Sequence, residues 1–65
     1  MLKNKIEKLI AKNGWTIDRI VNEINLKRNF VTKDSINNIL KGNKETIEES
    51  EYLMSILTDI QIETL

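Results

Sequence analysis

Residues 31–42, with the sequence VTKDSINNILKG, decide the fold of this chain. Three apolar residues recur there at the spacing of one helix face: Ile36, Ile39 and Leu40. Thr32 precedes them and has a side chain that commonly caps a helix, while Gly42 follows them, where a left-handed residue often ends one. The stretch therefore predicts a short amphipathic helix with its apolar face buried.

The same signals divide the rest of the chain into helices. Apolar stripes predict helices over residues 2–12, which end before Gly14, and over residues 17–25. Thr46 and Glu49 match a T-x-x-E capping box and predict the start of a fourth helix. Residues 60–65 fit either a strand-like alternation or the first turn of a fifth helix, and we favour the helix because the rest of the chain is helical.

Residues 26–31 follow neither a helical nor an alternating pattern and are predicted to be a basic connector. Leu26, Phe30 and Val31 are expected to hold the connector against the core. The other two aromatic residues, Trp15 and Tyr52, are also expected to pack on the core.

Composition limits the classes of function. Sixty-five residues suffice for a single domain spanning residues 1–65. The chain has no cysteine and no histidine, so it lacks the commonest metal ligands and general bases, and we expect no enzyme activity and no cofactor. No apolar run approaches the roughly 20 residues of a membrane span, and no secretion signal is recognisable, so a cytoplasmic location is predicted.

Charge is unevenly distributed along the chain. Residues 1–44 hold all ten basic residues and four acidic ones (10 − 4 = +6), whereas residues 45–65 hold six acidic residues and no basic one (−6). Such asymmetry predicts one surface that meets a polyanion and another that does not.

Together these patterns resemble a known family. Residues 31–42 are similar to the recognition helix and following glycine of phage repressor and Cro-type DNA-binding domains, the Xre family. Residues 14–21, GWTIDRIV, resemble the opening of that family's second helix, and residues 52–57 and 60–65 resemble its fourth helix and the start of its fifth. The resemblance implies an all-α, four- to five-helix, lambda repressor-like helix-turn-helix domain.

The sequence departs from the family pattern at three places. The connector between the second and third helices is about five residues longer than usual, Ile17 stands where a phosphate-binding glutamine is common, and Val21 replaces a small alanine. The first change alters the angle between the two helices and adds a basic loop.

The helix predicted in residues 31–42 turns its polar residues away from the buried triad. Asparagine can pair with adenine, lysine with guanine and aspartate with cytosine in the major groove. We therefore expect base contacts from Lys33, Asp34, Asn37 and Asn38. The expected phosphate contacts are Lys27, Arg28, Thr32, Ser35, Lys41, Asn43 and Lys44.

The resemblance further implies a homodimer on a palindromic site, with recognition helices about 34 Å apart. The candidates for the dimer contact are Met54, Ile60, Ile62 and Leu65, for which packing in the core is an equal alternative. The function predicted is sequence-specific binding of double-stranded DNA by a small phage- or mobile-element-type transcriptional regulator of Cro or repressor type. The alternative is a protein-interaction module, an antirepressor or adaptor that binds another regulator through its acidic C-terminal half.

Overall fold

The computed structural model of the chain describes residues 2–27, 31–42 and 47–65, except for the side chains of residues 47–49. These residues form four helices and no strand, which confirms the all-α class. The helices are α1 (Leu2–Asn13), α2 (Ile17–Lys27), α3 (Lys33–Leu40) and α4 (Ile47–Glu63).

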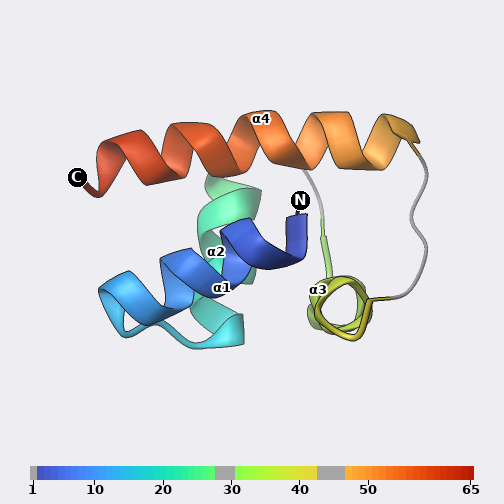
Figure 1. Cartoon of the computed structure of the whole chain (residues 1–65), viewed down its shortest axis with the longest axis horizontal. Helices are drawn as coiled ribbons and strands as arrows, with labels where there is room; N and C mark the ends of the chain where they lie inside the picture. The colour runs from blue at the N-terminus through green and yellow to red at the C-terminus, as the bar shows by residue number, and fades with distance from the viewer. Residues whose placement is uncertain (1, 28–30, 43–46) are drawn as a thin grey trace.

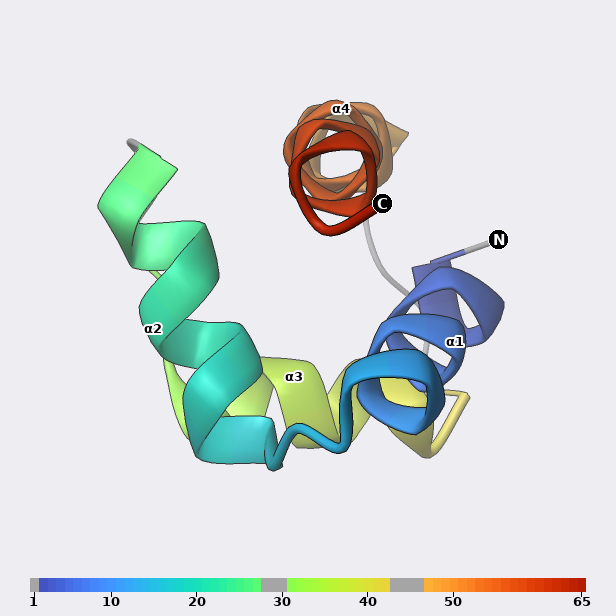
Figure 2. The same ribbon diagram turned by 90° about the vertical axis from the view of Figure 1, so that its left-hand side faces the viewer.

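The four helices form three levels. α4 runs along one side of the molecule, above the other three (Figure 1). Viewed nearly along α4, α1 and α2 lie on either side beneath it, and α3 crosses between them on the side away from α4 (Figure 2). Both α1 and α2 contact α3 and α4, but among the described residues no Cα atom of α3 lies within 8 Å of one in α4.

The core lies where α1 and α2 meet α3 and α4. Each helix contributes the apolar stripe that its sequence predicts, with side chains three or four residues apart. The buried residues are Leu2, Ile6, Leu9, Ile20, Ile24, Val31, Ile36, Ile39, Leu53, Ile56, Leu57 and Ile60. The last residue of the predicted α3 triad, Leu40, is partly buried against this core.

Both glycines end their helices as predicted. Gly14 and Gly42 have φ of +67° and +82°, the left-handed conformation that side chains disfavour. After Gly14 the Trp15 N–H donates to the Ile10 carbonyl at 3.1 Å, which closes a Schellman motif on α1. Gly42 donates to Ile39 at 3.0 Å and closes the last turn of α3 in a similar way. The Thr46–Glu49 capping box lies outside the described side chains.

α2 extends two residues past its predicted end, so the prediction for Leu26 is wrong. Leu26 belongs to the last turn of α2 and is 71% exposed, instead of holding a connector against the core. The connector between α2 and α3 is thereby reduced to residues 28–32. Val31 is buried as predicted, and Phe30 lies outside the described residues.

The predicted fifth helix is also wrong, because α4 continues without a break to Glu63. Thr64 still donates to the Ile60 carbonyl at 3.1 Å. Ile60 is only 1% exposed and extends the buried stripe of Leu53, Ile56 and Leu57 by one more turn. Packing of Ile60 therefore favours one long helix over a new one.

The aromatic residues differ in their packing. Trp15 is partly buried against the core, as expected for a residue that precedes an N-cap, and Arg19 lies over its ring at 4.8 Å from the centroid. Tyr52 is 43% exposed, so its predicted place in the core is wrong. It lies at the edge of the buried face of α4, which is filled by Leu53, Ile56 and Leu57.

Candidate nucleic-acid interface

α3 begins at Thr32, as predicted from the sequence. The Thr32 side-chain oxygen accepts a hydrogen bond from the Ser35 N–H at 3.2 Å, and its hydroxyl also lies 3.0 Å from the Ser35 hydroxyl. The backbone of Thr32 is extended, with φ −110° and ψ 164°, which is the usual N-cap conformation. The cap fixes where the polar face of α3 starts.

Removal of this cap tests its contribution. Thr32→Ala should lower the free energy of unfolding by about 1 kcal/mol, because one amide of the first turn of α3 loses its acceptor. Thr32→Ser keeps the acceptor and should leave stability close to that of the native chain. Urea titration of both variants measures the difference, and an equal loss in the serine variant would mean that the threonine methyl group, and not the hydrogen bond, is responsible.

The polar side chains of α3 point away from the core. Lys33, Asp34, Ser35, Asn38 and Lys41 are exposed, opposite buried Ile36 and Ile39. Asn37 is half-buried at the edge of this face. The four residues predicted to contact bases therefore share one side of a helix of eight residues.

An ion pair joins the beginnings of α2 and α3. The Lys33 ammonium lies 3.4 Å from a carboxylate oxygen of Asp18, and both side chains are largely exposed. Such exposed pairs contribute only about 0–1 kcal/mol, so Lys33 can exchange this partner for another at little cost. The pair shows that Lys33 reaches the surface shared by α2 and α3.

Asn25 positions the start of α3, which the sequence pattern does not reveal. Its side-chain oxygen accepts from the Val31 N–H at 2.8 Å, and its side-chain nitrogen donates to the Val31 carbonyl at 3.2 Å. Both backbone groups of buried Val31 are thus satisfied by a single amide, as a neighbouring strand would satisfy them. The sequence signal is only a half-buried asparagine beside Ile24 in an otherwise apolar stripe.

The predicted phosphate contacts occupy different environments. Ser35 and Lys41 are exposed beside α3, whereas Lys27, at the end of α2, forms an ion pair with Glu63 of α4. Lys27 would have to leave Glu63 to meet a phosphate. Arg28, Asn43 and Lys44 lie outside the described residues.

The four residues predicted as dimer candidates differ in how far they are exposed. Ile60 is a core residue, which is the alternative to a dimer contact that the sequence left open, and Met54 is partly buried against the core. Ile62 and Leu65 are 60% and 90% exposed near the end of α4. These two remain available for contact with another chain.

Most of the acidic C-terminal segment forms α4, which lies far from α3 in the fold. The segment that forms α4 holds no basic residue and these acidic ones: Glu48, Glu49, Glu51, Asp59 and Glu63. α4 lies on the opposite side of the molecule from α3 (Figure 2). A polyanion approaching α3 would therefore be kept away from the acidic helix.

No described helix is long and apolar enough to cross a membrane. Among the described residues no three acidic side chains are grouped so that they could hold a metal ion. The chain matches no protein-family model, no curated protein and no solved structure. Its function must therefore be inferred from the arrangement of its own side chains.

Proposed function

We propose that the chain binds duplex DNA as a small transcriptional regulator, with α2 and α3 as a helix-turn-helix and α3 in the major groove. The observation that carries the proposal is the position of α3. It exposes a polar face on the side of the molecule away from acidic α4, and in the described part of the chain no Cα atom of α3 lies within 8 Å of one in α4. An α-helix with its side chains is about 10–12 Å across, which fits the roughly 12 Å width of the major groove.

Sequence would be recognised by side chains on the exposed face of α3. Asn37 and Asn38 can each pair with N6 and N7 of adenine, Lys33 can donate to guanine, and Asp34 can accept from cytosine N4. Lys33 reaches this role by leaving Asp18, a weak exposed partner. A carboxylate near phosphates is repelled unless it accepts a hydrogen bond from a base amine. Asp34 should therefore favour a site with cytosine, whose N4 amine can donate to it.

The duplex backbone would be held at the two ends of α3. Ser35 and the amides of the first turn lie at the N-terminus, where the helix dipole favours a phosphate, and Lys41 lies at the other end. The Thr32 hydroxyl is already used in the cap, so its contribution is to orient Ser35 and the first turn. A second copy of the chain, held through Ile62 and Leu65, would supply the other half of a palindromic site.

Salt-dependent binding tests the proposal. Fluorescence anisotropy with a random-sequence duplex pool should show affinity falling tenfold or more between about 50 and about 200 mM salt, because bound phosphates release counterions. Lys33→Gln/Lys41→Gln removes the expected base contact of Lys33 and the expected phosphate contact of Lys41. The loss of one phosphate contact should make the slope of log K against log salt shallower by about 0.9.

Lys5→Gln/Lys12→Gln is the matched control, since it removes the same charge from α1, where both side chains face α4. Its slope should equal that of the native chain. Equal slopes in the two double variants would show that binding is a general effect of charge, without a role for α3. No binding at about 50 mM salt would exclude the DNA function.

In that case the second candidate is a protein-interaction module. The observation in its favour is that α4 gathers acidic residues on a separate level of the fold and ends near exposed Ile62 and Leu65. A basic regulator bound there would be insensitive to Lys33→Gln/Lys41→Gln. Binding to a protein partner with no salt-dependent affinity for DNA would select this function.

A further inference from the structure

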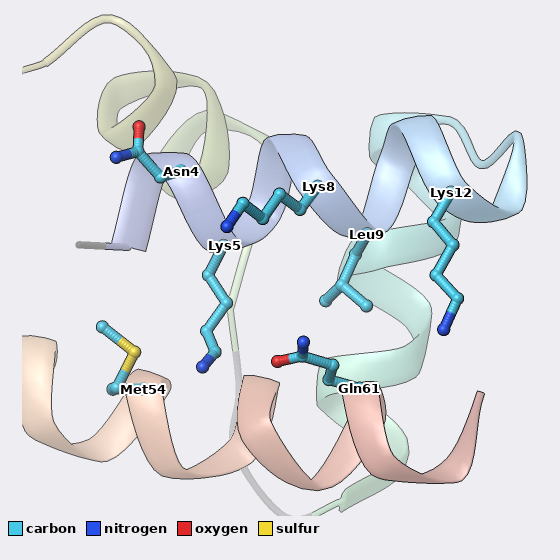
Figure 3. Close-up of a pocket in the computed structure, with 7 residues that line it drawn as sticks. All are labelled: Asn4, Lys5, Lys8, Leu9, Lys12, Met54 and Gln61. Atoms are coloured by element: carbon cyan, nitrogen blue, oxygen red, sulfur yellow. The ribbon is translucent and has the colours of Figure 1, made fainter. Parts of the chain in front are cut away.

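A cavity of about 260 Å³ lies between α1 and α4, on surfaces that the DNA proposal does not use. α1 contributes three lysines, Lys5, Lys8 and Lys12, which lie on one face because they are three and four residues apart. In Figure 3, Lys5 and Lys12 extend toward α4 on either side of Leu9, while Lys8 runs along α1 toward its first turn. Lys5 and Lys12 therefore place positive charge on both sides of Leu9, and Lys8 adds a third charge at the rim of the cavity.

This charge is not neutralised within the described part of the chain. None of the three lysines forms an ion pair with a described residue, and no acidic side chain lines the cavity. Like charges three or four residues apart on a helix repel one another and destabilise it. Moreover, the first turn of α1 holds no acidic residue, although the helix dipole favours one there. An anion bound here would reduce the repulsion among the lysines, and beside Asn4 it would lie near the first turn of α1.

The cavity also has an apolar wall. Leu9 is buried at its base, and Met54 of α4 is partly buried against the core. The amides of Asn4 and Gln61 complete the lining and can donate hydrogen bonds (Figure 3). A ligand with only charge would leave the apolar wall unused, and a ligand with only apolar groups would leave three ammonium groups without partners.

We propose that this cavity binds a small organic anion that has a doubly charged head and a compact apolar group, such as a phosphate monoester. The head would lie among the three lysines and the two amides, and the apolar group would lie against Leu9 and Met54. The volume is slightly below the roughly 300–1,000 Å³ of pockets for drug-sized ligands, so a compact ligand fits best. α3 does not line the cavity, so binding here does not depend on the DNA function.

Phenyl phosphate is the probe for this site, and methionine methyl groups provide the readout. The chain has two methionines, Met1 and Met54, so a ¹³C-methyl-methionine NMR spectrum contains two signals that can be followed during titration. The Met54 signal should shift in a saturable manner, with a Kd on the order of 1 mM for a ligand of this size. Inorganic phosphate and phenol each keep one half of the probe, and each should bind about tenfold more weakly or worse.

Lys5→Gln/Lys12→Gln should weaken phenyl phosphate about tenfold, since each exposed pair is worth somewhat under 1 kcal/mol. Lys33→Gln/Lys41→Gln carries the same change in charge on another surface and should bind as the native chain does. Circular dichroism verifies that both variants are folded. The same two variants serve as opposite controls for DNA binding, so failure of one proposal is distinguishable from failure of the other.

Three results would overturn the proposal. The first is a Met54 signal that does not shift or does not saturate. The second is an equal loss of affinity in both double variants, which means general attraction of anions to a basic surface. The third is equal binding of phenyl phosphate and inorganic phosphate, which means that Leu9 and Met54 make no contact with the ligand.

Discussion

Ile60→Ala should lower the free energy of unfolding by about 2–5 kcal/mol, whereas Ile62→Ala should change it by no more than about 0.5 kcal/mol. The two residues are of the same type and lie two positions apart on α4. Ile60 is 1% exposed, so its truncation leaves a cavity in the core, while Ile62 is 60% exposed and leaves none. A difference this large would show that the last turns of α4 pack on the core through Ile60 and leave Ile62 exposed to solvent.

The effect is large compared with the stability of so short a chain. A domain of this length has a free energy of unfolding of about 3–10 kcal/mol. Ile60→Ala would therefore remove a large part of the stability of the chain. Urea titration at two protein concentrations measures both variants and separates any contribution of self-association through Ile62. Similar losses in the two variants would mean that α4 does not pack through Ile60.

Local signals account for what the sequence predicted well. Gly14, Gly42 and Thr32 act on the backbone within a few residues of themselves, so the limits of α1 and α3 were within a residue of those observed. The apolar stripes identified most of the core for a similar reason, since three- and four-residue spacing already defines one helix face. The exposed face of α3 followed from the same geometry.

The errors lie where a distant partner determines the outcome. Leu26 and Lys27 carry no stop signal, so α2 includes both, and Lys27 forms an ion pair with Glu63 of α4, 36 residues away in the chain. For Ile60 the sequence left a dimer contact and core packing as equal alternatives, because it could not show that α4 remains one helix to Glu63. Tyr52 was placed in the core for its type alone, although Leu53 and Ile56 already occupied the inner face.

The α3 surface could be predicted from the sequence, whereas the cavity between α1 and α4 could not. For the α3 surface, the periodicity of one helix sufficed to identify the exposed residues. The lysines of α1 give no comparable signal in the sequence, because nothing in their spacing reveals that α4 lies opposite. Met54 and Gln61 complete that cavity from more than forty residues away in sequence.

Asn25→Ala should lower the free energy of unfolding by about 2 kcal/mol. The variant loses two hydrogen bonds, each with a net contribution of roughly 0.5–1.5 kcal/mol, and leaves the N–H and carbonyl of buried Val31 without their partners. Asn22→Ala is the matched control, since Asn22 is exposed on the same helix and the substitution is identical. Thermal or urea unfolding of the two variants gives the comparison, and equal stability would show that water replaces the Asn25 amide at little cost.

If α3 recognises DNA, Asn25→Ala should also change binding in a particular way. The amide holds the residue that precedes Thr32, so its loss frees the start of α3 to shift relative to α2 while Lys33, Ser35 and Lys41 remain on the same face. Phosphate contacts tolerate such a shift, but pairing with base edges requires accurate placement. We therefore expect the folded variant to keep the salt dependence of the native chain and to lose about tenfold in preference for a selected sequence over the random pool. A variant that keeps its full sequence preference would mean that packing of Ile36 and Ile39 alone orients α3.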